Sequence, residues 1–252
     1  MVQRVLVTAG ASGIGREIAR AFAANGASVF VCDIDEAALA GLAEEIPGAA
    51  MQVCDMASRD DIERMVPSAI AALGGLDVLI NNAGIAGPTA PVEAIEPDEW
   101  DRVIQVNLNG TFYVTRLAIP HLKRSAAGVI VIMSSLAGRL GYGNRSPYAA
   151  SKWALIGFTK TLSIELGEYG IRANAILPGI VEGARIERVF EGRAKVSGQS
   201  LDEVRRAAMS MQSIKSLVDP RDIAALAVFL ASDSAKSISG QALSIDADAQ
   251  RL

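Results

Sequence analysis

The chain reads Thr8-Ala9-Gly10-Ala11-Ser12-Gly13-Ile14-Gly15 at the point where a segment over residues 2–8 gives way to a run of helical period. The segment over residues 2–8 is predicted to be a strand, and Asn25-Gly26 predicts the C-terminal end of the helix. Glycines at such a turn let the backbone approach a pyrophosphate, and the helix N-terminus adds unpaired N–H groups. The stretch therefore predicts an α/β unit that binds a dinucleotide, although the usual Gly-x-Gly-x-x-Gly string is absent.

Strand-like and helix-like segments alternate through the rest of the sequence. Further strands are predicted over residues 27–33, 50–56, 76–80, 128–135, 171–177 and 241–246. Residues 128–135 are apolar and largely β-branched, as expected for a parallel strand that is covered on both faces. No linker composition divides the 252 residues, so we expect one domain over residues 1–252. Its predicted architecture is a doubly wound parallel sheet of about seven strands, with helices on both faces.

Composition and charge argue against several classes of protein. The net charge of −4, with no basic stripe outside residues 183–215, disfavours nucleic-acid binding. No run of about 18 apolar residues occurs, so we expect no membrane span, and the lack of a secretory signal pattern favours a cytoplasmic protein. Cys32 and Cys54 are expected to be reduced core thiols, and His121 a surface residue. These residues form no ligand cluster, so no metal is expected.

The second predicted strand ends in an acid, Asp33. A carboxylate at this place can accept hydrogen bonds from the adenosine ribose hydroxyls, and it would repel a 2′-phosphate. Ile34-Asp35-Glu36 follows and adds only acids. The sequence therefore predicts NAD rather than NADP as the cofactor. The alternative is that Asp33 merely caps the next helix, a role for which Asp35 is better placed.

Tyr148 and Lys152 lie at i and i+4, so a helix starting near Pro147 places both on one face. A phenol has a pKa of about 10, and a neighbouring ammonium lowers that pKa and so yields a general acid/base. This spacing also occurs on many solvated helix faces. The preceding strand favours the catalytic interpretation, because Ser135 at its carboxyl end can hydrogen-bond the same substrate oxygen as Tyr148.

The Ser135 strand, the Tyr148-x-x-x-Lys152 helix and the glycine turn together resemble the short-chain dehydrogenase/reductase family over residues 2–246. The resemblance implies a Rossmann-like fold. Ala9 departs from the family's Thr-Gly-x-x-x-Gly-Ile-Gly pattern, in which a glycine stands at this position. We expect a negative φ at Ala9, because alanine is costly otherwise. Glu182-Gly183 replaces the region where a threonine is frequent, which leaves recognition of the nicotinamide carboxamide in doubt.

The resemblance also implies the site residues. The catalytic residues would be Ser135, Tyr148, Lys152 and Asn107. The cofactor-binding residues would be Gly10, Ser12, Gly13, Ile14, Gly15, Asp33, Asp55, Met56, Asn82, Ala83, Gly84, Tyr148, Lys152, Pro178, Gly179 and Val181. In the family an asparagine matching Asn107 bends its helix and holds a water that links the lysine to a proton relay. The alternative for Asn107 is a buried amide that local backbone satisfies.

The predicted activity is NAD-dependent hydride transfer between a secondary alcohol and a ketone, with Tyr148 as general acid/base. Two alternatives stay open: a reductase of 3-oxoacyl thioesters, and a dinucleotide-binding regulator without catalysis. The resemblance further implies a homo-oligomer, either a tetramer or a dimer.

Residues 183–215 are expected to form a substrate lid, as in the family. They carry seven basic and four acidic residues, in contrast to the acidic chain as a whole. We therefore hypothesise a small polar hydroxy substrate that carries an anionic group, because guanidinium groups bind such groups in a bidentate way. At least one of Arg139, Arg145, Arg185 and Arg188 would face it. The alternative is that these arginines are solvated lid surface or make subunit contacts.

Overall fold

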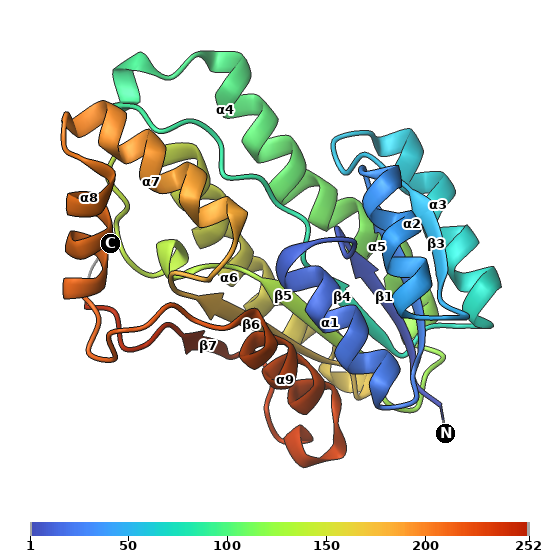
Figure 1. Ribbon diagram of the computed structural model, residues 1–252. Helices are drawn as coiled ribbons and strands as arrows, with labels where there is room; N and C mark the ends of the chain where they lie inside the picture. The colour runs from blue at the N-terminus through green and yellow to red at the C-terminus, as the bar shows by residue number, and fades with distance from the viewer. Residues whose placement is uncertain (1, 251–252) are drawn as a thin grey trace.

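All seven strands of the sheet run parallel, in the order β3-β2-β1-β4-β5-β6-β7. The computed structural model describes residues 2–250 (Figure 1). The strands are β1 (Arg4–Thr8), β2 (Ser28–Asp33), β3 (Ala50–Val53), β4 (Val78–Asn81), β5 (Val129–Met133), β6 (Arg172–Pro178) and β7 (Ala242–Ile245). The chain starts in the middle of the sheet, winds outward to β3 and then crosses to β4. The strand order thus reverses between β1 and β4, where such sheets form a ligand crevice.

Helices cover both faces of the sheet, which confirms the predicted doubly wound fold. One face packs against α1 (Gly13–Ala24), α2 (Glu36–Glu45) and α9 (Pro220–Ala231), and the other against α3 (Arg59–Leu73), α5 (Gly110–Leu122) and α6 (Ser146–Leu166). Side chains of a strand point alternately to the two faces. Val5 and Val7 accordingly join the core under α1, whereas Leu6 joins the core under α5.

Three further helices, α4 (Pro97–Ile104), α7 (Ala184–Ser197) and α8 (Leu201–Ser210), do not lie on the sheet core. The α7 and α8 helices pack on each other around Phe190, Val204 and Ala208, and they lie toward the end of the molecule that also carries α4 (Figure 1). Both α7 and α8 lie within residues 183–215, the segment expected to form the substrate lid. Within residues 2–250, none of the helices is both long and apolar enough to cross a membrane.

A π-helical turn, Gln105–Asn109, lies between α4 and α5, so the three segments form one continuous helical stretch over residues 97–122. Helix caps agree with the sequence. Asp35 accepts a hydrogen bond from the Ala38 N–H at 3.0 Å, as expected for the cap of α2. The buried thiols of Cys32 and Cys54 are both free.

The prediction of a negative φ at Ala9 is wrong, because Ala9 has φ +49°. The turn after β1 requires a left-handed residue here, and a left-handed alanine costs roughly 1 kcal/mol. Tertiary contacts hold the turn in this conformation. The amide Nδ2 of Asn82 donates to the carbonyls of both Thr8 (3.1 Å) and Ala9 (2.9 Å).

Candidate active site

The glycine turn presents the N-terminus of α1 at the carboxyl edge of the sheet. Gly13 has φ +52°, and a Cβ on Gly15 would stand 2.3 Å from the Ala9 carbonyl oxygen. Ser12, the N-cap residue, makes no side-chain cap hydrogen bond. The N–H groups of the first turn of α1 are therefore not covered by a capping side chain. Such free N–H groups at a helix N-terminus fit the pyrophosphate of a dinucleotide.

The next predicted site residue, Asp33, lies directly beside this turn. Its carboxylate accepts hydrogen bonds from the N–H groups of Ala11 (3.0 Å) and Asp35 (3.2 Å), and the residue is buried, with 8% exposed. None of the described arginine or lysine side chains forms an ion pair with it. Asp33 therefore does not cap α2, and its acceptor oxygens fit ribose hydroxyls next to the turn.

On the adenine side of the expected site, Asp55 follows β3. One of its oxygens accepts from the Ala57 N–H at 2.8 Å, and the other lies 3.4 Å from the Arg102 guanidinium. Met56 is buried, and its carbonyl oxygen would lie 2.4 Å from a Cβ on Gly110. Asp55 and Met56 thus lie just beyond the carboxyl end of β3.

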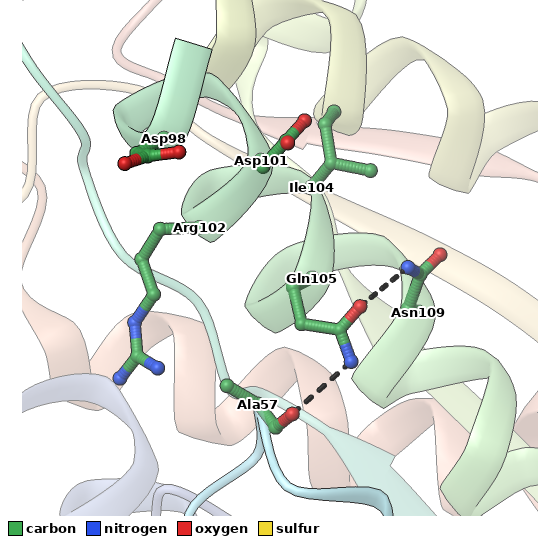
Figure 2. A pocket seen from close by; sticks show the side chains of 7 residues that line it. All are labelled: Ala57, Asp98, Asp101, Arg102, Ile104, Gln105 and Asn109. Carbon is green, nitrogen blue, oxygen red and sulfur yellow. Dashed lines mark hydrogen bonds between the residues drawn. The ribbon is translucent and has the colours of Figure 1, made fainter. Parts of the chain in front are cut away.

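An open hollow of about 510 Å³ borders this region (Figure 2). Gln105 lies in it, donating to the Ala57 carbonyl at 3.1 Å and accepting from Asn109 at 2.7 Å. The hollow is lined by Ala57, Asp98, Asp101, Arg102, Ile104, Gln105 and Asn109. It includes none of Ser135, Tyr148 and Lys152, so it is separate from the residues with acid/base chemistry.

The residues after β4 join the glycine turn to the acid/base group. The backbone N–H groups of Asn82 and Ala83 both donate to the Thr8 hydroxyl, at 3.0 and 3.1 Å. Asn82 is one of the predicted cofactor-binding residues, and its Nδ2 braces the turn by donating to the carbonyls of Thr8 and Ala9. A Cβ on Gly84 would lie 3.2 Å from the Asn107 amide oxygen and 3.3 Å from the Lys152 ammonium, so a side chain at this position would crowd both groups.

Tyr148 and Lys152 lie together on α6, and Lys152 contacts the carboxyl end of β5. The Lys152 ammonium lies 5.6 Å from the centre of the Tyr148 ring and donates to the Met133 carbonyl at 2.7 Å. Burial lowers the pKa of Lys152 to about 8, against the opposing effect of Tyr148. Ser135 is half-buried, and its hydroxyl accepts from the Ala137 N–H at 3.1 Å.

The pKa of Tyr148 lies below its usual value of 10.0. Burial alone would raise it, but Lys152, Arg185, the Ser135 hydroxyl and Arg145 together lower it further than burial raises it. A phenol with a lowered pKa next to a hydroxyl donor is suited to accept and return a proton.

Asn107 lies inside the π-helical turn, with 0% of its surface exposed. Its amide oxygen accepts from the Ile85 N–H at 2.7 Å, and its Nδ2 donates to the Ile85 carbonyl and the Ser151 hydroxyl, both at 3.1 Å. The extra residue of the π turn aims this side chain at the backbone after β4. The amide is thus satisfied by backbone and Ser151, and it has no direct hydrogen bond to Lys152.

At the nicotinamide end, the Pro178-Gly179 turn closes β6. A Cβ on Gly179 would lie 2.7 Å from the Cα of Asp246, so the turn packs directly on the chain after β7. Val181 pairs with Val218, and the Glu182 N–H donates to the Val218 carbonyl at 3.0 Å. The exposed Glu182 therefore has a fixed backbone, although it offers no hydroxyl in place of the threonine.

The structure divides the four arginines that were expected near the substrate. Arg139 is exposed and donates to Ser244 at 3.2 Å, and Arg188 is also exposed. Arg145 is 2% exposed and lies against the Tyr148 ring, and Arg185, although exposed, approaches the same ring to 6.0 Å. Sequence reasoning gave no role to Arg193, which lies two turns after Arg185 and 4.6 Å from the ring centre of Tyr142. Only the recurrence of arginine along α7 hinted at it.

Comparisons with known proteins agree with this geometry. The family model described as Enoyl-(Acyl carrier protein) reductase, which represents short-chain dehydrogenases/reductases, matches residues 8–247. The chain is 36% identical over 246 residues to D-beta-hydroxybutyrate dehydrogenase of Cupriavidus necator, covering 96% of this chain and 95% of that protein.

Two solved structures are similar along almost the whole chain. An actinorhodin polyketide ketoreductase with NADPH has 33% identity and a TM-score of 0.93, covering 98% of this chain and 96% of that one. NAD⁺-bound xylitol dehydrogenase has 31% identity and a TM-score of 0.92, covering 96% and 97%. The chain therefore belongs to the short-chain dehydrogenase/reductase family, whose members are oxidoreductases that bind a nicotinamide dinucleotide.

Proposed function

We propose that the protein is an NAD-dependent dehydrogenase that interconverts a secondary alcohol and a ketone. The observation that carries the proposal is the half-buried Tyr148, whose pKa is lowered by Lys152 and by the Ser135 hydroxyl. A general acid/base of this kind, at the carboxyl edge of a dinucleotide-binding sheet, is what reversible oxidation of an alcohol requires.

Each residue has a distinct task in this proposal. The Tyr148 phenolate takes the proton of the substrate hydroxyl, while the Ser135 hydroxyl donates a hydrogen bond to the oxygen that becomes the carbonyl. The Lys152 ammonium stabilises the phenolate, and Asn107 holds the loop after β4 that faces Lys152. A bound nicotinamide would supply the hydride chemistry. In the reverse direction, the Tyr148 phenol returns the proton to the alkoxide.

The preference for NAD rests on Asp33. Its carboxylate lies beside the glycine turn, where the ribose of a bound dinucleotide would lie, and a 2′-phosphate there would meet a buried negative charge. The similar structures include one with NADPH and one with NAD⁺, so similarity alone favours neither.

Residues 1–252 form one functional domain in this proposal, and α7 and α8 serve as the substrate lid. A 3-oxoacyl thioester reductase is the second candidate, since one similar structure is a polyketide ketoreductase. That activity with NADPH as its cofactor would conflict with Asp33. A regulator without catalysis would need no phenol with a lowered pKa.

The proposal is tested by Tyr148→Phe. The variant should lose turnover of a panel of secondary alcohols by a factor of about 10³ or more, because it lacks the proton acceptor. Its affinity for NADH should stay within a few-fold, as measured by fluorescence titration. Substantial alcohol oxidation by the Tyr148→Phe protein, or NADH binding without turnover in the unmutated protein, would contradict the assignment.

The cofactor preference is tested by Asp33→Ala. In the unmutated protein kcat/KM should be at least about 100-fold higher with NAD than with NADP. The substitution should weaken use of NAD and improve use of NADP, because it removes ribose acceptors and the repulsion together. Asp35→Ala is the matched control, since Asp35 caps α2, and it should leave the cofactor ratio unchanged. Equal use of both cofactors by the unmutated protein would show that another residue decides the preference.

A further inference from the structure

Arg145 is a buried cation without a carboxylate partner. Only 2% of the residue is exposed. Its Nη2 donates to the Ala86 carbonyl at 2.7 Å and its Nη1 lies 3.4 Å from the Thr89 hydroxyl, while Nε has no hydrogen-bond partner among residues 2–250. A buried charge is normally paired, because removing it from water costs much more than neutral hydrogen bonds return. The surroundings of Arg145 therefore lack an anion.

Two tyrosines form a wall beside this guanidinium. The centres of the Tyr142 and Tyr148 rings lie 6.4 Å apart, and the Arg145 guanidinium carbon lies 5.3 and 5.2 Å from them. The ring faces attract a cation, but while both phenols are protonated they carry no net charge. Whenever Tyr148 is protonated, Arg145 thus lies next to it with its charge uncompensated.

Two more guanidinium groups reach the same rings from α7. Arg185 lies 6.0 Å from the centre of Tyr148, and Arg193 lies 4.6 Å from the centre of Tyr142. None of the three arginines forms an ion pair within the described chain. The nearby acid Glu187 is instead paired with Arg205 on α8. Arg185 and Arg193 also add to the effect of burial in lowering the pKa of Arg145, as like charges do.

We propose that Arg145, Arg185 and Arg193 bind a carboxylate of the substrate, so that the enzyme acts on short hydroxy acids and their oxo acids. This inference rests on the proposed function, since it places the substrate hydroxyl at Tyr148. An anion between the three guanidinium groups removes their mutual repulsion and supplies the missing partner of Arg145. Arg145 and Arg185 lie 5.2 and 6.0 Å from the centre of the Tyr148 ring, and Arg193 lies 4.6 Å from the centre of the neighbouring Tyr142 ring. A carboxylate bound by these groups must therefore be only a few atoms from the hydroxyl-bearing carbon.

The space beside the cluster also favours a short substrate. A cavity of about 20 Å³ adjoins it, lined by Tyr142, Ile180, Ile186, Phe190, Arg193, Ala208 and Met211. This volume holds roughly one water-sized group. The cavity therefore accommodates a small apolar group such as a methyl, but no long acyl chain.

The first measurement compares 3-hydroxybutanoate with two neutral alcohols, its slightly larger methyl ester and the smaller butan-2-ol, each with NAD. The acid should have a kcat/KM at least about 100-fold above those of the two neutral alcohols, because the carboxylate gains charge-assisted hydrogen bonds. In Arg145→Gln and in Arg193→Gln this preference should fall by a factor of about 10 to 100. Arg139→Gln is the control and should keep the preference, since Arg139 is exposed and bound to Ser244. Equal kcat/KM values for the acid and the neutral alcohols would overturn the proposal.

A second measurement does not depend on turnover. Butanoate binding to the protein with NADH is followed by calorimetry, and butanamide serves as the neutral comparison. Butanoate should bind and butanamide should not, and Arg193→Gln should weaken butanoate at least tenfold even if Arg145→Gln fails to fold. Binding of butanoate without turnover of any alcohol would refute the proposed function and leave the carboxylate site standing. Binding of inorganic phosphate without butanoate, or of neither anion, would overturn the site.

Discussion

Lys152 is the residue at which stability and chemistry conflict. Its ammonium is buried, with 3% exposed, and one carbonyl oxygen is its hydrogen-bond acceptor. The difference between the ordinary pKa of 10.5 and a pKa of about 8 corresponds to roughly 3 kcal/mol against the charged form. The fold thus bears a cost for keeping a positive charge beside Tyr148. A buried, unpaired charge lowers stability, and such a cost is typical of functional sites rather than of structural positions.

Lys152→Met should therefore stabilise the protein at pH 7, by about 1–3 kcal/mol, while abolishing turnover. Well below pH 8 both the folded and the unfolded lysine are protonated, so the penalty is complete. As the pH rises from 8 toward 10.5, the folded lysine loses its proton first, the penalty shrinks, and the gain from the substitution should shrink with it. Denaturant unfolding at pH 7 and pH 9.5 measures both effects.

Lys160→Met is the matched control for this prediction. Lys160 lies on the same helix but is exposed, and its ammonium donates to the Gly240 carbonyl at 3.1 Å. The control should show no gain at either pH. A Lys152→Met protein that is less stable than the parent at pH 7 would mean that the hydrogen bond to Met133 outweighs the burial of the charge.

At the scale of elements, local chemistry predicted most of the fold. Helix α3 spans Arg59–Leu73, because Ser58 caps its start and Gly74 ends it in a left-handed conformation. The β-branched runs likewise became the central strands. These signals lie within a few residues of the element that they define, so they can be read without the tertiary structure.

The features that the sequence did not predict depend on distant contacts. The positive φ of Ala9 depends on Asn82, and the π turn around Asn107 packs against Ile85. Arg193 meets Tyr142 only because α7 folds back over the loop before α6. No pattern of neighbouring residues encodes such pairs. The proximity of Tyr148 and Lys152 was predictable for the opposite reason, since both residues lie on one helix.

At the scale of the whole molecule, an apolar surface lies on α5 and α6, on the side away from the sheet. Ile164 is 82% exposed, Trp153 52% and Phe112 45%, and the Phe112 ring packs against Phe158 between the two helices. Trp153 and Ile164 are eleven residues apart on α6, so they lie on the same side of the helix. Large apolar side chains gathered in this way mark an interface. We propose that a second copy of the chain covers this surface, since self-association through one shared patch is the commonest assembly of soluble proteins.

Ile164→Glu tests this assembly without disturbing the fold, because a side chain with 82% of its surface exposed has few contacts to lose within one copy. The parent protein should run in solution at a multiple of 26.4 kDa, and the variant should shift toward 26.4 kDa as the concentration falls. A carboxylate on this surface would be buried against the partner without a counter-charge, which weakens association by several kcal/mol. Val92→Glu is the control, since Val92 is 67% exposed but lies in the loop before α4, and it should leave the assembly intact. Light scattering coupled to size exclusion measures the mass of each protein. A parent protein of 26.4 kDa at every concentration would show that this surface is not covered by a second copy.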